Sequence, residues 1–217
     1  MKIETHLHSS QTSRCGRLPG ERMAELYAES GYGAAILTDH INKNTGSADA
    51  FLAGYRAFAE RAGQLGLIPL LGAEARLVDL GPEDYLIYGL SEGDVDWLLA
   101  LLCREPSLVR FSEEVRGRGW LLIQAHPYRD GLMEAADYRC LDGVEVLNGN
   151  PRHEAHDDLA RAFADAHGLI ATAGSDAHRP EDVCRTGLIV PDGLRTMADF
   201  TAYLRLEPRP HILAPGG

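Results

Sequence analysis

The sequence has no pair of cysteines at C-x-x-C spacing, and its four cysteines are spread widely over 217 residues. Such spacing argues against a disulfide framework and is typical of a protein from a reducing compartment. The sequence also lacks the run of about 18 uncharged apolar residues that a membrane-spanning helix needs. The N-terminal stretch MKIETHLHSS contains charges and histidines where a signal peptide has an apolar segment. We therefore expect a cytoplasmic protein with no membrane partner.

Basic residues are also few. The chain has 21 Lys and Arg against 32 Asp and Glu, which gives a formal net charge of −11. A surface of this charge repels nucleic acid unless a local site reverses the sign. Long nucleic acids are therefore not expected as partners. A small phosphorylated molecule is compatible with this charge if a bound cation attracts it.

Short apolar segments alternate along the chain with longer segments of helical periodicity. The strands predicted from the apolar segments are Lys2–His6, Ala34–Thr38, Ile68–Glu74, Tyr85–Leu90, Trp120–Ala125, Gly143–Leu147, Leu169–Ala173 and Gly187–Val190. Their nearly continuous apolar content is typical of parallel strands covered on both faces. The helices predicted between and after them are 19–31, 48–65, 95–103, 108–117, 154–167 and 196–206. This order predicts an α/β protein with a parallel sheet closed into a compact, distorted barrel. No linker divides the chain, so we expect one domain over residues 1–217.

Histidines and acidic residues follow five of the predicted strands, each at the carboxyl end. These residues are His6, His8, Asp39, His40, Glu74, His126, Asp176 and His178. In a barrel of parallel strands these ends meet at one rim, where such folds carry their active sites. Uncompensated carboxylates and imidazoles at one place would cost stability, whereas a cation would bind them. The sequence therefore predicts a metal site at this rim.

The predicted ligands are imidazoles and carboxylates, which suit zinc, manganese or iron without selecting among them. They are more numerous than the four that one tetrahedral ion needs. We therefore expect more than one divalent transition metal.

The same residues form a series of motifs: H-x-H (His6, His8), TDH (His40), G-x-E (Glu74), HP (His126) and GSDAH (Asp176, His178). In this order they resemble the PHP family, named for polymerase and histidinol phosphatase, and GVEVLNGN at 143–150 also looks like a segment of that family. The resemblance covers nearly the whole chain. It implies a distorted (β/α)7 barrel with two or three metals at the carboxyl ends of the strands.

The resemblance also implies how the ligands are shared. One metal would be held by His6, His8, Glu74 and Asp176. Glu74 would bridge to a second metal, which His126 also binds. The third metal would be held by His40 and His178.

The chain departs from the family pattern in two places. Where many members carry a histidine after the fourth strand, residues 84–94 read DYLIYGLSEGD. Either Glu92 substitutes for that histidine or the second metal site is weak. In the first loop Cys15 stands where the family supplies another ligand. It is either a thiolate ligand of the third site or an inert buried thiol.

The predicted activity is hydrolysis of a small phosphate ester, similar to histidinol phosphate or a nucleotide, by a metal-activated hydroxide. Glu74 and Asp176 are the predicted catalytic carboxylates. Arg129, just after the HP motif, is the preferred phosphate clamp, ahead of Arg14 and Lys43.

Several other roles follow from position. Asp39 is expected to orient a ligand. A nearby imidazole or a metal-bound water would protonate the leaving group, although we expect His153 and His156 to be solvated.

Three alternatives remain open. Amidohydrolases also begin with H-x-H, but many of them use a carbamylated lysine on a middle strand, and the only lysines here are Lys2 and Lys43. A non-catalytic metal-binding PHP module is the second alternative, favoured by the missing second-site histidine. A nuclease acting on DNA ends is the third, and the charge of the chain argues against it.

Overall fold

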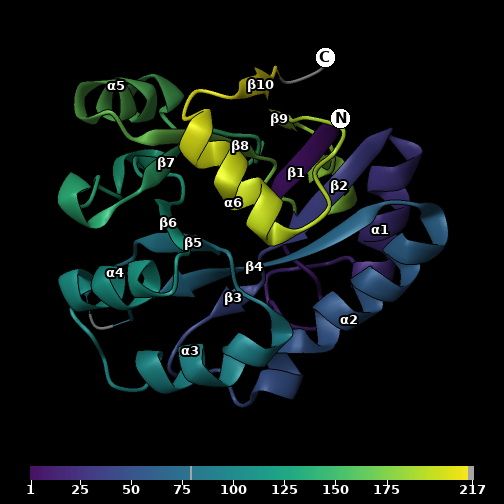
Figure 1. Cartoon of the computed structure of the whole chain (residues 1–217), viewed down its shortest axis with the longest axis horizontal. Helices are drawn as coiled ribbons and strands as arrows, with labels where there is room; N and C mark the ends of the chain where they lie inside the picture. The colour runs from purple at the N-terminus through teal and green to yellow at the C-terminus, as the bar shows by residue number, and fades with distance from the viewer. Residues whose placement is uncertain (79, 215–217) are drawn as a thin grey trace.

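The computed structural model describes residues 1–78 and 80–214, and its strands form one nearly closed sheet (Figure 1). The order is β10-β9-β1-β2-β4-β5-β6-β7-β8, with β3 paired to β4. The strands are β1 (Lys2–Leu7), β2 (Tyr32–Leu37), β3 (His40–Ile41), β4 (Ile68–Arg76), β5 (Asp84–Tyr88), β6 (Leu121–Gln124), β7 (Gly143–Asn148), β8 (Ile170–Gly174), β9 (Gly187–Ile189) and β10 (His211–Leu213).

The barrel closes where β8 and the segment after it return to β1. Thr5 Oγ1 donates to the carbonyl of Ala173 at 2.8 Å, and the amide of His8 donates to the carbonyl of Ala177 at 2.9 Å. The strand β9 runs antiparallel to β1 and pairs with it only along its first half, at Lys2 and Ile3. The predicted α/β barrel is therefore confirmed, and β9 distorts its closure.

Six helices cover this sheet: α1 (Gly20–Glu29), α2 (Ala48–Leu65), α3 (Val95–Leu102), α4 (Leu108–Gly117), α5 (Asp157–His167) and α6 (Met197–Leu206). Short 3-10 turns occur at Glu92–Asp94, Arg129–Gly131, Tyr138–Cys140 and Pro180–Asp182. The bounds of α2 follow from its caps. The Ser47 side chain accepts from the Ala50 amide, and Gly66 ends the helix with φ of 75°. Within the described residues, no helix has both the length and the hydrophobicity to cross a bilayer.

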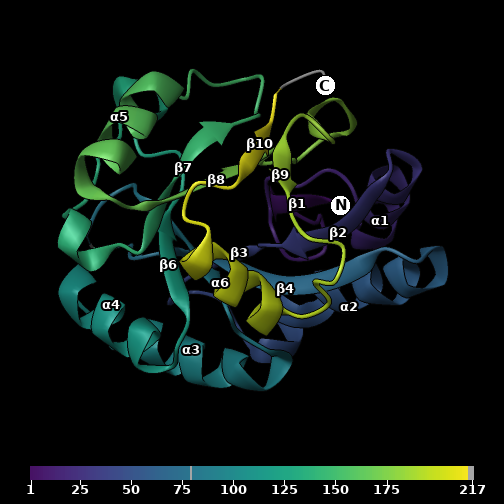
Figure 2. The same cartoon turned by 45° about the horizontal axis from the view of Figure 1, so that its top comes forward.

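One helix, α6, lies across an end of the barrel, and the other helices lie around its sides (Figures 1 and 2). Phe200 and Leu204 of α6 pack in one cluster with apolar residues near the starts of several strands, among them Ile3, Leu121 and Ile170. Each such side chain contributes roughly 1.5–3 kcal/mol when fully buried. This end of the barrel is therefore filled, and the carboxyl ends of the parallel strands are left for a site.

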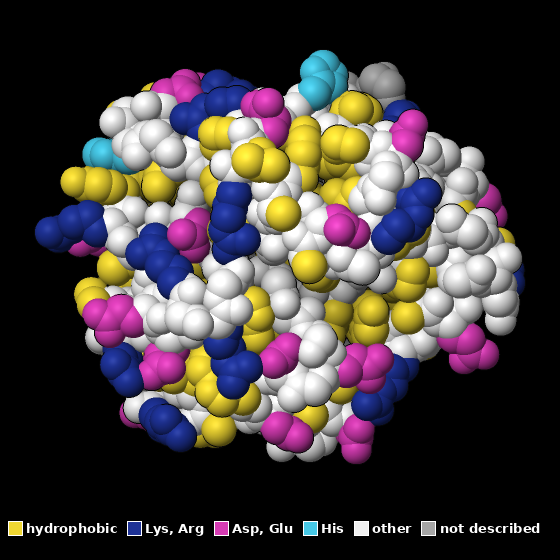
Figure 3. Space-filling model, in the orientation of Figure 1, with side chains coloured by type: hydrophobic (Ala, Val, Ile, Leu, Met, Phe, Trp, Pro, Cys, Tyr) yellow, Lys and Arg dark blue, Asp and Glu magenta, His cyan; other side chains and the backbone are white. Residues whose placement is uncertain are grey.

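The face that α6 covers carries charged side chains of both signs. In Figure 3, Lys and Arg are interspersed there with Asp and Glu. No broad area of a single charge is seen on this face.

The expectation of an entirely parallel sheet is wrong for β5 and β9. β5 is antiparallel to both β4 and β6, and β9 is antiparallel to β1. Residues 77–83, between β4 and β5, are too few for the crossover that parallel strands require, so the chain turns back as a hairpin. Asp84, the first residue of β5, therefore lies at the rim where the parallel strands end.

We expect Gly54 of α2 to be essential for packing beside this rim. A methyl group there would overlap the Ser9 hydroxyl and approach Asp39 Oδ2 to 2.8 Å. Because Ser9 is buried and bonded to Asp39, it cannot move cheaply. Gly54→Ala should lower the free energy of unfolding by about 1–3 kcal/mol in urea denaturation. Gly63→Ala, where nothing lies within 4 Å in the same helix, should be neutral or stabilising. Equal stability of the two variants would contradict this packing.

Candidate metal centre

Seven imidazole and carboxylate side chains meet at the end of the barrel opposite α6. They are His6, His8, His40, Glu74, His126, Asp176 and His178, and all but His40 are buried. Among the described residues, these side chains and Asp84 form four groups of three, and within each group the three ligand atoms lie within 4.8 Å of one another. The structure thus brings together all the histidines and acids that the motifs predict as metal ligands.

The innermost ligand atoms lie as close together as ligands of one cation. The Nε2 atoms of His6 and His8 are 3.1 Å apart, and they lie 3.3 Å from Glu74 Oε1 and 3.3 Å from Glu74 Oε2, respectively. The same two atoms lie 3.5 and 3.3 Å from Asp176 Oδ1. Ligands about 2.0–2.1 Å from a tetrahedral zinc would be about 3.3–3.4 Å apart. These four residues therefore fit one divalent cation.

Glu74 also contacts His40 of β3 and His126, which follows β6. His126 Nε2 lies 3.1 Å from Oε1, and His40 Nδ1 lies 2.7 Å from Oε2. One carboxylate thus stands between an inner group of ligands and two further imidazoles. This is the position that a bridging ligand would occupy between neighbouring cations.

An outer group consists of His8, His40 and His178, whose ring nitrogens lie close together. Cys15 belongs beside this group, because it lines the same cavity wall as His40 and His178. Burial raises the pKa of the Cys15 thiol, but the two imidazoles outweigh that effect and lower the pKa to about 6. Cys15 is exposed, so the expectation of an inert buried thiol is wrong.

Asp84 is a site residue that the sequence reasoning missed. It is buried, and one of its oxygens groups with His40 and Glu74. Arg76 Nε donates to Asp84 Oδ1 at 2.7 Å. The only signal in the sequence is an acid directly before the apolar segment YLIY, which points to the rim only if β5 runs antiparallel.

The prediction that Glu92 could serve as an alternative ligand is wrong, because β5 runs antiparallel to its neighbours. Because β5 runs away from the rim, the residues that follow it lie at the other end of the barrel. Glu92 is exposed and accepts from Arg56 Nε at 2.9 Å. It cannot replace a ligand at the centre.

Glu145 of β7 orients the ligands from behind. One oxygen lies 3.0 Å from His6 Nδ1, while the other accepts from the His126 amide at 3.1 Å and from Asn148 Nδ2 at 2.8 Å. The contact at Nδ1 leaves His6 Nε2 directed at Glu74 and Asp176, as ligand-orienting carboxylates do in metal sites.

Asp39 acts at a second position behind the ligands. It accepts hydrogen bonds from the hydroxyls of Ser9 and Ser13, both at 2.6 Å. Ser13 Oγ in turn lies 3.4 Å from His8 Nδ1 and accepts from the amide of His40 at 3.0 Å. This arrangement suits the orienting role expected for Asp39.

The charges at the centre depend strongly on one another. Burial lowers the pKa of His6, but three carboxylates, Glu145 first, raise it well above its usual value. Burial raises the pKa of Glu74 and Asp176, yet the histidines around both, and Arg129 beside Asp176, lower it well below the usual range. A bound divalent cation would take the place of protons on imidazole ligands.

Unpaired polar atoms and backbone conformation also fit a bound cation. Glu74 Oε2 and His126 Nδ1 are buried and have no well-aligned hydrogen bond within the described residues. His126 and Asp176 adopt φ of 29° and 47°, a conformation that side chains other than glycine rarely take. Strain of this kind persists where the surroundings fix it and is common at functional sites.

A cavity of about 260 Å³ opens above the ligands and is bordered by arginines. These are Arg76, Arg129, Arg152 and Arg179. Arg129 contacts Asp176, and Arg152 contacts the buried Asp182. Only Arg129 was predicted; Arg76, Arg152 and Arg179 approach the cavity from separate segments and carry no motif. The cavity thus offers guanidinium groups to an anion despite the net negative charge of the chain.

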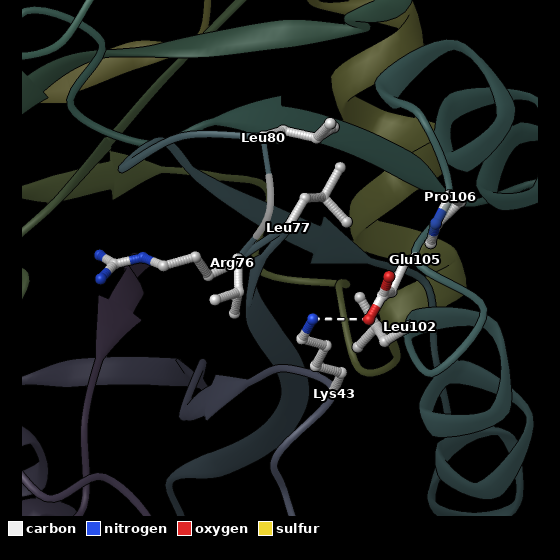
Figure 4. Close-up of a pocket in the computed structure, with 8 residues that line it drawn as sticks. Lys43, Arg76, Leu77, Leu80, Leu102, Glu105 and Pro106 are labelled. Atoms are coloured by element: carbon white, nitrogen blue, oxygen red, sulfur yellow. Dashed lines mark hydrogen bonds and ion pairs between the residues drawn. The ribbon is translucent and has the colours of Figure 1, made fainter.

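The other candidate residues from the sequence lie at different distances from this cavity, and only His153 borders it. Arg14 borders an adjoining groove. Lys43 lines a different small pocket, where its Nζ lies 2.6 Å from Glu105 Oε1 (Figure 4). The guanidinium of Arg76 points away from that pocket. His153 is exposed and lies in the cavity wall, with Nδ1 2.7 Å from Asp130 Oδ2, whereas His156 does not border the cavity.

Comparison with known proteins shows that this fold is shared with proteins described as metal-dependent phosphoesterases. A family described as PHP-associated matches residues 155–207. A two-domain protein from Bacteroides vulgatus, containing a predicted PHP-like metal-dependent phosphoesterase, aligns at 20% identity and TM-score 0.71 over 99% of this chain and 65% of its own. A proposed metal-dependent phosphoesterase from Bifidobacterium adolescentis aligns at 16% identity and TM-score 0.61, over 94% and 95% of the two chains.

An amidohydrolase from Chromobacterium violaceum is also similar, at 19% identity and TM-score 0.59, over 100% of this chain and 99% of its own. None of the curated protein sequences compared with the chain matched it. The PHP-associated match is confined to residues 155–207, and the solved structures share the barrel-like fold.

We expect Glu145→Gln to weaken metal binding without removing a ligand. A glutamine has nearly the same volume, but its amide cannot accept from His6 and His126 at the same time. Zinc affinity, measured against a competing chelator, should fall about 10–100-fold. Glu92→Gln, at the far end of the barrel, is the matched control and should bind zinc normally. A folded Glu145→Gln protein with unchanged affinity would contradict the orienting role.

Proposed function

We propose that the chain is a metal-dependent hydrolase of a small phosphate ester. The observation that supports this most is the meeting of seven metal-type ligands below a cavity bordered by four arginines. Carboxylates and imidazoles at this spacing suit divalent transition metals such as zinc, manganese or iron. Arginines above them suit the oxygens of a phosphate.

We assign the ligands to two or three cations. The first would be held by His6, His8, Glu74 and Asp176, whose ligand atoms lie closest together. Glu74 would bridge to a second, with His126 and the newly found Asp84 nearby. The third would be held by His40 and His178 with the Cys15 thiolate.

Divalent cations bound at this site would supply an activated water and neutralise charge on the phosphoryl oxygens. The chain's own residues provide the rest. Glu74 and Asp176 fix the ligand set, and each is held ionised by surrounding imidazoles. Arg129 lies against Asp176, so its guanidinium is placed to bind a phosphate above that carboxylate.

A proton for the leaving oxygen can come from His153. Its ring borders the cavity, and its Nδ1 donates a hydrogen bond to Asp130 Oδ2, which fixes the orientation of the imidazole. An imidazole held by a carboxylate in this way is a common general acid.

The amidohydrolase alternative receives less support from this geometry. Lys2 lies at the start of β1, away from the rim, and Lys43 is paired with Glu105. The bridging position is taken by Glu74 instead of a lysine. The arginine border likewise favours a substrate-binding site over a metal-binding module without activity.

Removal of single ligands tests the proposed activity. Purified protein should contain two or three transition-metal equivalents by elemental analysis and release phosphate from small phosphate esters. His8→Ala, Glu74→Ala and Asp176→Ala should each lose activity by at least about 100-fold, because each removes a ligand of the first cation. Glu92→Ala is the control and should retain it. Full activity in the three ligand variants, or turnover of lactones and amides without phosphate esters, would overturn the proposal.

The thiolate at the third position has a spectroscopic signature. Protein loaded with Co²⁺ should show an intense near-ultraviolet band from thiolate-to-cobalt charge transfer. Cys15→Ser should abolish that band, whereas Cys103→Ser removes another exposed thiol and should retain it. A band that survives in Cys15→Ser would exclude Cys15 as a ligand.

A further inference from the structure

A second hollow, a groove of about 640 Å³, adjoins the metal cavity. It lies between the loop after β1 and the loop that joins β3 to α2. The two hollows share Cys15, His40 and Arg76 in their walls. A molecule whose phosphate lies over the metal ligands can therefore extend past His40 into the groove. Its volume is typical of sites for small organic molecules, whereas the metal cavity is smaller than that range.

The charge of the groove differs from that of the whole protein. No aspartate or glutamate of the described residues borders it, although acidic residues outnumber basic ones in the chain. Its charged side chains are Arg14 and Arg76, and Arg76 is already paired with Asp84. Apart from the Cys15 thiolate, which is assigned above to a metal, the groove wall has no described acidic group to attract a cationic ligand and suits a neutral or an anionic one.

Amide and hydroxyl groups on the β3–α2 loop form one wall of the groove. Asn42 accepts from the Asn44 amide at 2.8 Å through Oδ1, and Thr45 Oγ1 accepts from the Asn42 amide at 3.0 Å. The Thr45 amide closes the turn on the Asn42 carbonyl at 3.0 Å. These bonds fix the turn. They leave the Asn42 amino group and the Asn44 side chain without a hydrogen bond among the described residues. The Asn42 NH2 group can donate to a sugar hydroxyl, and the Asn44 side chain can both donate and accept.

The groove offers little to an aromatic ligand. Phe51 is the one Phe, Tyr or Trp of the described residues in its wall, and it is only 1% exposed. The His40 ring is stacked on His8, with centroids 4.4 Å apart. A nucleobase gains much of its binding energy by stacking on exposed aromatic rings, and the described wall of the groove has no exposed Phe, Tyr or Trp for this.

We propose that this groove binds the alcohol part of the substrate, and that this part is a sugar or another polyol and not a nucleoside or an aromatic alcohol. The proposal rests on the phosphoesterase function proposed above. It adds the class of the leaving group, which the metal ligands alone leave open.

Binding of phosphonate analogues tests the groove separately from catalysis, because their P–C bond is not hydrolysed. Calorimetry on the zinc-loaded protein would compare analogues of glycerol 3-phosphate and glucose 6-phosphate with those of methyl phosphate, phenyl phosphate and AMP. At least one polyol analogue should bind about tenfold or more tightly than the methyl, phenyl and AMP analogues, since the groove's free amides would pair with its hydroxyls.

A pair of glycine variants locates that preference. Neither Gly46, in the groove wall, nor Gly117, at the end of α4, has any atom within 4 Å of an added Cβ. Gly46→Trp should therefore fold and fill the groove, reducing the preference for the polyol analogue by at least about tenfold. Gly117→Trp should leave it unchanged. Asn44→Ala should weaken binding of the polyol analogue and leave binding of the methyl, phenyl and AMP analogues unchanged.

The outcomes separate the two proposals. If polyol analogues bind preferentially but no phosphate ester is hydrolysed, the groove proposal stands and the phosphoesterase function fails. If esters are hydrolysed but the methyl, phenyl or AMP analogue binds as tightly as the polyols, the groove proposal fails alone. An unchanged preference in Gly46→Trp, or no binding of any analogue, also overturns it.

Discussion

The buried carboxylate of Glu74 is the group on which the arrangement of the whole centre depends. It lies within 3.3 Å of ring nitrogens from four histidines, His6, His8, His40 and His126. These histidines come from three different parts of the barrel wall, and a carboxylate buried there without them would be costly. The attraction between one acid and several imidazoles therefore holds the rim together, and the same atoms are the ones that cations would bind.

Strand direction explains why this centre has the members it has. Parallel strands bring their last residues to the rim, which gathers the H-x-H, TDH, G-x-E and HP motifs. The hairpin from β4 to β5 reverses that rule once, so a first residue, Asp84, reaches the rim and Glu92 leaves it. A short loop thus changes the ligand set as much as a substitution would.

This explains how far the sequence could predict the structure. The positions of α2 and α4 and the histidine ligands follow from local patterns: apolar periodicity, helix caps and polar residues after strands. The direction of β5 depends on loop length and pairing, which periodicity does not reveal. Arg76, Arg152 and Arg179 converge from separate segments and resemble surface residues in the sequence. Glu145 lies in an apolar strand, and only its contact with His6 shows why an acid is buried there.

The arginine border also resolves the conflict between a net charge of −11 and a phosphate substrate. Three of the four guanidinium groups are paired with acids at the site, Arg76 with Asp84, Arg129 with Asp176 and Arg152 with Asp182. A cation held by Asp176 would compete with Arg129 for the same carboxylate and so weaken that ion pair. The guanidinium would then have its donors available for an anion beside the cation. In the proposed function, metal binding and phosphate binding would therefore be coupled through Asp176, and the charges that line the cavity would matter more to a bound phosphate than the net charge of the chain.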